Sequence, residues 1–478
     1  MNTFPGKIVS PKTQHFREAH AMKRLPRPAL FENEISSTIN AFFISFNIGA
    51  LLKKVGAYKN KGIPVVTVFQ QLFALVFIHK SLFQALRSGE TGKIAKDTFY
   101  RLLNSCNINW RRFVHSLAGK IIRDKLEKLT APERVNVFIV DDTLYERKRS
   151  SKVELLSHVR DHNRGISTRG FRLLTLGWSD GNTFIPVDTQ PLASENEKKR
   201  LQQAREIDKR SCGHKQRLMA QTKAPLVMID MLSTAIAVGI NAKYVLCDSW
   251  FSAPANILKI IAEKLHVITM AKKTPKVHYR YNGQMLSSME IYRRNRKRRG
   301  RSRYLLSVDA EIESKDGSVI PVRLVYVRKR GKKKEYLVLL STDMSLSEEE
   351  IIQIYGKRWQ IEVFFKVCKS YLRLTKECHS TSYDAVVAWN AIVLSRYMML
   401  AVDKRLEEDP RSFGELFFDT CDEMPDITWT KALMLLMNTF VNIAAEKYFL
   451  ADDEVECLLE EFMNALPTTL KNNLQLCA

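Results

Sequence analysis

The sequence predicts an α/β core that is interrupted by a β-rich stretch and lies between two helical regions. Within residues 131–271, β-branched apolar runs alternate with helical stretches, which is the pattern of an α/β unit. Within residues 272–343, apolar and polar residues alternate between turn signals, as in strands with one exposed face. The chain therefore divides into five parts: 1–130, 131–271, 272–343, 344–404 and 405–478.

The N-terminal part is expected to be a small helical domain with a basic surface. The run from Val65 to Leu86 is apolar on all sides, which is typical of a core helix. Asp97 or Thr98 could cap the helix that follows. Five basic residues belong to this segment: Lys93, Lys96, Arg101, Arg111 and Arg112. We expect this surface to bind nucleic acid, and a charged solvated surface is the alternative.

The predicted α/β core begins with a strand, RVNVFIVDDT, that ends in two aspartates. A hairpin turns at Asp180–Asn182, and a helix is expected from about Lys215 to Val238. KYVLCDSWF is a second apolar strand and ends at Asp248. A helix beginning near Ser252 and the strand HVITMAKK complete this part. Trp250 and Phe251, beside Asp248, are expected in the core.

Two dense cationic runs lie in the β-rich stretch, at residues 293–303 and 328–334. Both flank predicted strands instead of forming a tail, so a surface that contacts phosphates is favoured over a solvated loop. The arginines expected to bind DNA are Arg293, Arg294, Arg296, Arg298 and Arg299.

The net charge also points to a polyanionic partner. The 478 residues carry a formal charge of +24 and a pI near 9.6, which favours nucleic acid. Residues 405–478 contain five Lys/Arg and fifteen Asp/Glu, so residues 1–404 carry +34. This acidic helical region is expected to contact protein, and a soluble pair of helices is the alternative.

Cysteine usage and the N-terminal sequence favour a reducing cytoplasm. The eight cysteines are scattered without a CxxC pair, so neither a zinc ribbon nor a disulfide scaffold is indicated. The first residues, MNTFPGKIVSPKTQHF, lack the apolar core of a signal peptide. The most apolar run, Ile63 to Ile78, is too short to span a membrane.

A single helix after Ser347 is predicted to present four functional side chains. In YGKRWQIEVFFKVCKS, the side chains of Tyr355, Arg358, Glu362 and Lys369 return to an arc of roughly 60°. Apolar residues beside this arc would bury the helix. The alternative is a buried helix whose edge carries a structural Arg358–Glu362 pair.

Three acids are candidates for chemistry. Asp141 and Asp248 close two apolar strands, and functional groups of α/β sheets collect beyond such strand ends. Glu362 could join them from the helix. Clustered carboxylates suit divalent metal ions and phosphodiester chemistry. Each acid also has a structural alternative: Asp141 or Asp142 in a turn, Asp248 as a helix cap and Glu362 paired with Arg358.

The ordered motifs VDDT, LCDSWFS and Y-(2)-R-(3)-E-(6)-K resemble those of DDE transposases of the bacterial insertion sequence 4 family. The resemblance covers about residues 131–400. It implies a ribonuclease H-like core with a β-rich insertion, and a metal-binding catalytic triad of Asp141, Asp248 and Glu362 that holds two Mg²⁺ ions, with Mn²⁺ as a substitute. It also implies that Tyr355, Arg358 and Lys369 contact DNA near the scissile phosphate. Asp142 stays an alternative first acid, although the family's D-x-T pattern favours Asp141.

The predicted function is therefore cut-and-paste transposition at the terminal inverted repeats of an insertion sequence. The partners would be double-stranded end and target DNA, recognised through the N-terminal region. A homodimer in a synaptic complex and a location in the bacterial cytoplasm, associated with the nucleoid, are expected. The alternatives are a repressor derived from a transposase that binds DNA without cutting it, and a nuclease that cuts without joining.

Overall fold

The computed structural model describes residues 37–421, except 132, 162–163, 301, 314–316, 318, 330–334, 407–411, 414 and 419, together with residues 454, 457 and 461. The first 36 residues of the N-terminal part and most of the acidic region 405–478 therefore lie outside the described residues.

Eleven strands form one mixed sheet. Its order is β2-β3-β1-β5-β6-β11-β10-β9-β7-β8, and β4 also pairs with β3. The neighbours β1, β5 and β6 run parallel, whereas β3 lies antiparallel to β1. The strands are β1 Val137–Glu146, β2 Ser157–Asp161, β3 Ile166–Ser179, β4 Phe184–Leu192, β5 Tyr244–Cys247, β6 His266–Met270, β7 His278–Tyr281, β8 Gln284–Ser287, β9 Tyr304–Glu313, β10 Val319–Arg328 and β11 Tyr336–Ser341.

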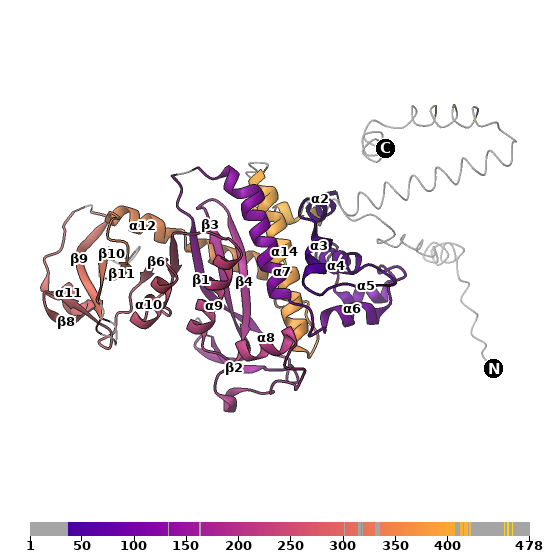
Figure 1. Ribbon diagram of the computed structural model, residues 1–478, viewed down its shortest axis with the longest axis horizontal. Coiled ribbons are helices and arrows are strands. Elements are labelled where there is room, and N and C mark those ends of the chain that lie inside the picture. Colours follow the sequence, from indigo (N-terminus) through magenta and orange to yellow (C-terminus); the bar gives the residue numbers. More distant parts are fainter. Residues whose placement is uncertain are drawn as a thin grey trace, which may run out of the picture.

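The β-rich stretch extends the sheet of the core. Strand β11 pairs antiparallel with β6, with Leu340 opposite Thr269, and β10, β9, β7 and β8 follow outward. In Figure 1 these strands occupy one end of the molecule and the N-terminal helices lie at the other. The sequence predicted these strands, and the mixed α/β architecture is consistent with a ribonuclease H-like nuclease fold.

The helices before the first strand pack partly on one another and partly on the sheet. Their bounds are α2 Ser37–Ser45, α3 Ile48–Lys54, α4 Val65–Ala74, α5 Leu82–Arg87, α6 Lys96–Leu103 and α7 Trp110–Ile121. Helix α7 contacts β4 and lies beside the long helix α14, Tyr383–Leu406 (Figure 1). The remaining α-helices are α8 Cys212–Ala220, α9 Ala224–Ala237, α10 Pro254–Ala262, α11 Ser288–Arg294, α12 Glu348–Gly356 and α13 Trp359–Ser370.

Helix α14 lies inside the fold. It is the one helix in the described part that is long and apolar enough to cross a membrane, but its most apolar 18-residue window is fully buried by the protein itself. Arg396, with no exposed side-chain surface, pairs with Glu377 and donates hydrogen bonds to the Leu72 and Phe73 carbonyls. This long helix thereby joins the N-terminal helices to the sheet.

Three predicted helices are interrupted. The apolar run from Val65 to Leu86 forms α4 and all of α5 but its last residue, because His79 adopts a left-handed backbone conformation between them. The region predicted as one helix from Lys215 to Val238 forms α8 and α9, with Pro225 in the first turn of α9. The helix of the YGKRWQIEVFFKVCKS segment is broken into α12 and α13 at Lys357 and Arg358.

Candidate active site

The register of two parallel strands brings Asp141 and Asp248 together. Val140 of β1 lies opposite Cys247 of β5, so the aspartates that follow them are neighbours across the sheet. Strand β5 ends there, whereas β1 continues to Glu146 and stays paired with β3. The sequence had suggested that Asp141 closes its strand. In the structure it lies within β1 instead. It is nevertheless the first residue of β1 beyond the pairing with β5.

The neighbours Asp141 and Asp142 have different cationic partners. Arg358 Nη1 lies 2.9 Å from Asp141 Oδ2. Arg172 of β3 forms a two-pronged ion pair with Asp142, with its Nε 2.8 Å from Oδ2. Successive side chains on a strand point to opposite faces, so only one of the two can face the helix that carries Arg358. This geometry supports Asp141 as the first acid.

Burial and neighbouring carboxylates raise the proton affinity of both aspartates, with Asp248 acting on Asp141 and Asp142 acting on Asp248. Burial raises the pKa of Asp141 to about 7, and the charge of Asp248 adds to this effect while Arg358 opposes it. Burial also raises the pKa of Asp248, although its Oδ1 accepts a hydrogen bond of 2.8 Å from the Trp250 backbone. The site thus has more negative charge than its resident cation balances.

Helices α12 and α13 bring the remaining side chains to β1 despite the break between them. Arg358 donates hydrogen bonds to both Asp141 and Glu362. Lys369, the second-last residue of α13, donates to Thr143 Oγ1 at 2.6 Å. Tyr355 lies partly buried in α12, with its ring centroid 5.9 Å from the guanidinium carbon of Arg358. Arg358 and Lys369 therefore contact one stretch of β1 directly, and Tyr355 and Glu362 are linked to it through Arg358.

A cavity of about 560 Å³ opens beside Lys369 and the stretch of β1 from Asp141 to Thr143. Its lining includes Asp141, Asp248, Thr143 and Lys369. Further cations also line it: Arg160, Arg164, Arg172 and Lys376. Asp142, Glu146 and Asp161 also line the cavity, so its carboxylates and cations are interspersed. Such a lining can hold a phosphate next to a metal ion.

The donor set fits a divalent ion in part. Asp141 and Asp248 offer the hard oxygen ligands that Mg²⁺ prefers, in a buried place with surplus negative charge. Glu362 is held by Arg358. Among the described residues, no three His, Cys, Asp or Glu side chains lie close enough together to share one ion.

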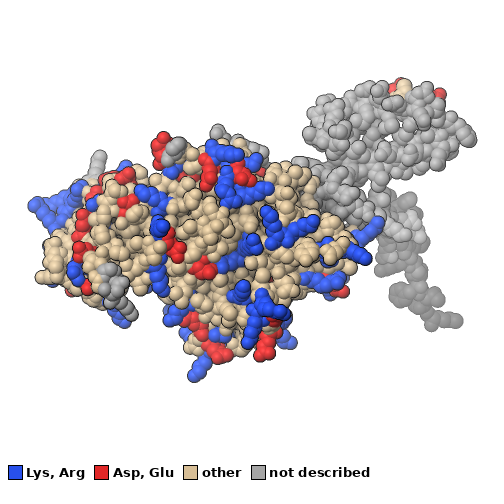
Figure 2. Space-filling model, viewed as in Figure 1, with Lys and Arg blue, Asp and Glu red and all other residues tan. Residues whose placement is uncertain are grey.

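The predicted arginines of the β-rich stretch lie away from this cavity. They belong to the last turn of α11 and the loop after it, and all five side chains are exposed. Four strand spacings separate β9, which follows that loop, from β5, which is roughly 19 Å at about 4.8 Å per strand. Figure 2 shows basic side chains gathered at the end of the molecule formed by these strands.

Two side chains near the site were not predicted from the sequence. Trp250 was expected in the core but is 52% exposed, whereas Phe251 is buried as expected. Arg172 and Lys272 lie over the Trp250 ring, at 5.8 and 5.4 Å from its centroid. Arg172, an isolated cation in the apolar strand GFRLLTLGW, was the available signal, because a charge there needs a partner.

Comparison with known families agrees with this arrangement. The sequence pattern of one family, described as DDE superfamily endonuclease, matches residues 75–330, which is more than half of the chain. The chain belongs to the DDE superfamily endonucleases. No curated protein matches it.

Membership of the DDE endonucleases supports a nuclease that uses divalent metal ions and acts on DNA. The matched range contains Asp141 and Asp248 but ends before α13, so it does not include Glu362. The narrower resemblance to the insertion sequence 4 family therefore stays a prediction.

Proposed function

We propose that this DDE endonuclease is the transposase of an insertion sequence, which cuts DNA at terminal inverted repeats and transfers the strands to target DNA. One observation carries the proposal. Asp141 and Asp248 lie at neighbouring positions of parallel strands, and Arg358 links Asp141 to Glu362 of α13. The acids of the predicted triad come from segments up to more than 200 residues apart, and this arrangement supports the proposal.

The proposed roles follow from the chemistry of the side chains. Asp141, Asp248 and Glu362 would hold two Mg²⁺ ions, with Mn²⁺ as a substitute. Bound there, the ions would supply Lewis-acid activation of the attacking and leaving oxygens of a phosphodiester. The surplus negative charge of the two aspartates favours cation binding.

The residues around the triad would hold the DNA strand. Lys369 and Thr143 line the cavity, and Arg358 contacts Asp141 of the same lining, with Tyr355 beside it. Each can donate to a phosphate oxygen. The exposed arginines after α11 would contact the duplex roughly 19 Å away, which is about six base pairs at ~3.4 Å each.

Two further parts of the proposal concern assembly. The N-terminal helices would recognise the terminal repeats, and a homodimer would synapse two ends in the bacterial cytoplasm, associated with the nucleoid. The acidic region 405–478 is the proposed dimer contact. Its deletion is expected to give a monomer by light scattering, and a dimer that persists after deletion would refute this assignment.

A cleavage assay tests the triad directly. The substrate is a duplex carrying the repeats that flank the gene, incubated with Mg²⁺. Wild type is expected to nick at the repeat boundary, and Glu362→Gln is expected to bind the duplex without cutting it. Glu349→Gln, an exposed neighbour in the first turn of α12, is the matched control and should cut normally.

The outcomes separate the alternatives. Retained cleavage by Glu362→Gln would remove Glu362 from the triad. Specific binding without cleavage by wild type would favour a repressor derived from a transposase. Cleavage without joining to a second DNA would favour a simple nuclease.

A further inference from the structure

Arg358 lies between two of the three proposed metal ligands. Its Nη1 is 2.9 Å from Asp141 Oδ2, and its Nη2 donates to Glu362 Oε1. One guanidinium therefore bridges a strand carboxylate and a helix carboxylate. The three side chains are largely shielded from solvent, with exposures of 17% for Arg358, 18% for Asp141 and 35% for Glu362.

This bridge competes with a metal ion for the same oxygens. A divalent cation shared by Asp141 and Glu362 would lie in the space between the two carboxylates that the guanidinium now fills. Partial burial weakens screening, so a second cation beside Arg358 would also be repelled. The bridge and a metal ion shared by these two carboxylates therefore exclude each other.

A phosphodiester is a suitable alternative partner for Arg358. Its planar group binds phosphate oxygens in two-pronged fashion, as it binds carboxylates. Arg358 lies at the junction of α12 and α13, and the Tyr355 ring provides a contact that does not depend on the carboxylates. The side chain can therefore leave the acids and still be held at the edge of the cavity.

We propose that Arg358 occupies the position of the metal ion in the free protein and blocks metal binding there. A DNA phosphate would draw the Arg358 side chain away from the two carboxylates. Binding of a DNA phosphate to Arg358 would free Asp141 and Glu362 to ligate a cation. This inference rests on the proposed function. Its consequence is reciprocal: DNA strengthens metal binding, and metal strengthens DNA binding by the same factor.

Manganese binding by the full-length protein provides the test, with Mn²⁺ followed by electron paramagnetic resonance. The duplex carries the flanking repeats, and Mn²⁺ bound by DNA itself is measured with the Asp248→Asn complex. Wild type is expected to bind Mn²⁺ about tenfold more tightly with DNA than without it, a typical coupling. Arg358→Gln should bind Mn²⁺ without DNA as tightly as the wild-type complex, and DNA should add nothing.

Two control variants separate the bridge from other effects. Arg210→Gln removes an equal charge from an exposed ion pair with Asp208, which does not line the cavity, so it should keep the wild-type coupling. Arg358→Lys keeps the charge but loses the two-pronged geometry, and should fall between wild type and Arg358→Gln. It keeps the test available if the glutamine variant does not fold.

Equal Mn²⁺ affinity of free wild type and free Arg358→Gln would overturn the inference while leaving the metal site intact. Coupling that persists in Arg358→Gln would also overturn it. If the wild-type complex binds no more Mn²⁺ than the Asp248→Asn complex, the proposed metal-dependent function fails as well.

Discussion

At the scale of single residues, the pair Asp141–Asp142 shows how two identical side chains acquire different properties. Each has its own arginine, but Asp141 shares its surroundings with Asp248 and has a pKa raised to about 7 by burial and by that neighbour. Strand alternation predicted that the two would point apart. The sequence could not identify their arginine partners, because Arg172 and Arg358 come from distant segments.

The raised pKa of Asp141 makes a prediction for the metal-free protein. An acid whose pKa is higher in the folded state makes the protein less stable as pH rises from the pKa of the unfolded state, 3.8, to that of the folded state, about 7. Asp141→Asn removes this loss in the free energy of unfolding, which amounts to at most about 4 kcal/mol. In EDTA, Asp141→Asn should therefore melt higher than wild type at pH 8, and this advantage should disappear near pH 4.

The neighbouring Asp142→Asn is the control for this measurement. It loses the Arg172 ion pair and should gain no stability at pH 8. A melting temperature of Asp141→Asn that does not exceed that of wild type at pH 8 would contradict the prediction.

At the scale of elements, long-range contacts determine the break between α12 and α13, which the periodicity of the sequence did not predict. The pattern from Tyr355 to Ser370 predicts a continuous helix, and the backbone at Lys357 and Arg358 is still helical. The helix nevertheless breaks after Gly356, where helix propensity is low. Lys357 donates to the Val135 carbonyl at 2.7 Å, and Arg358 binds Asp141. Neither partner is local in sequence, so the break could not be predicted.

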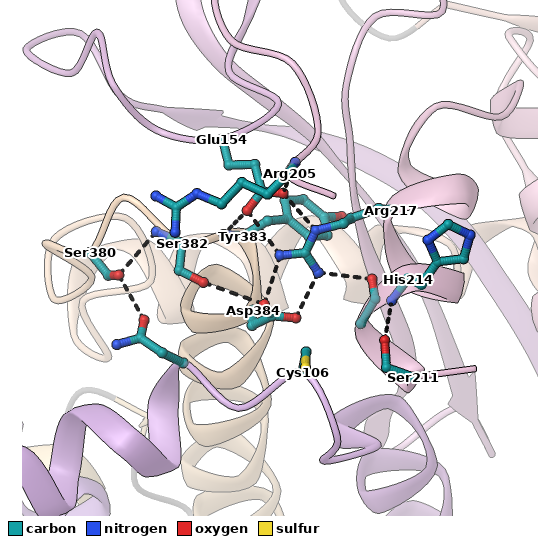
Figure 3. A network of polar contacts seen from close by, with 12 residues as sticks. Cys106, Glu154, Arg205, Ser211, His214, Arg217, Ser380, Ser382, Tyr383 and Asp384 are labelled. Atoms are coloured by element: carbon teal, nitrogen blue, oxygen red, sulfur yellow. Dashed lines mark hydrogen bonds and ion pairs between the residues drawn. The ribbon is translucent and has the colours of Figure 1, made fainter. Parts of the chain in front are cut away.

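A buried ionic network fastens three elements beneath the sheet (Figure 3). Arg217 of α8 is 3% exposed and pairs with Glu154 and with Asp384 of α14. Tyr383 donates its backbone N–H to Glu154, and Arg205 does the same from a neighbouring loop. The network therefore ties α8, the loop before β2 and the start of α14 together.

Removing the central cation should be costly. Arg217→Met leaves two buried carboxylates without their partner, and the free energy of unfolding should fall by about 3–5 kcal/mol in denaturant titrations. Arg210→Met, at an exposed ion pair with Asp208 just before α8, is the matched control and should cause no measurable loss. Equal stability of the two variants would mean that Glu154 and Asp384 become solvated or protonated without penalty.

At the scale of the whole molecule, one sheet connects the candidate active site to a distant basic surface. The sequence predicted the core strands except β2, and it predicted the β-rich character of the insertion. It did not predict that β11 would pair with β6 and make a single sheet. Such a pairing depends on contacts about 70 residues apart, which local periodicity does not contain.

This arrangement predicts that the exposed arginines after α11 contribute to DNA affinity without contributing to DNA cleavage. Replacing Arg296 and Arg299 by Gln should weaken DNA binding and reduce the slope of log affinity against log salt by about two at most. Lys198 and Lys199, exposed in a short 3₁₀ helix, provide a double variant of equal charge change that should leave the slope unchanged. An unaltered slope for the arginine variant would assign that loop to solvent.

The buried position of α14 also affects how the protein is made. Arg396 of this helix bonds to the carbonyl of Phe73, 323 positions earlier in the chain. At about 5–20 residues per second, a ribosome needs roughly 15–65 s to synthesise that interval. During this time the apolar side chains of α4 and α7 that α14 covers lack their partner. Nascent copies of this protein are therefore exposed to chaperones and proteases for most of their synthesis, which would keep the amount of active enzyme low.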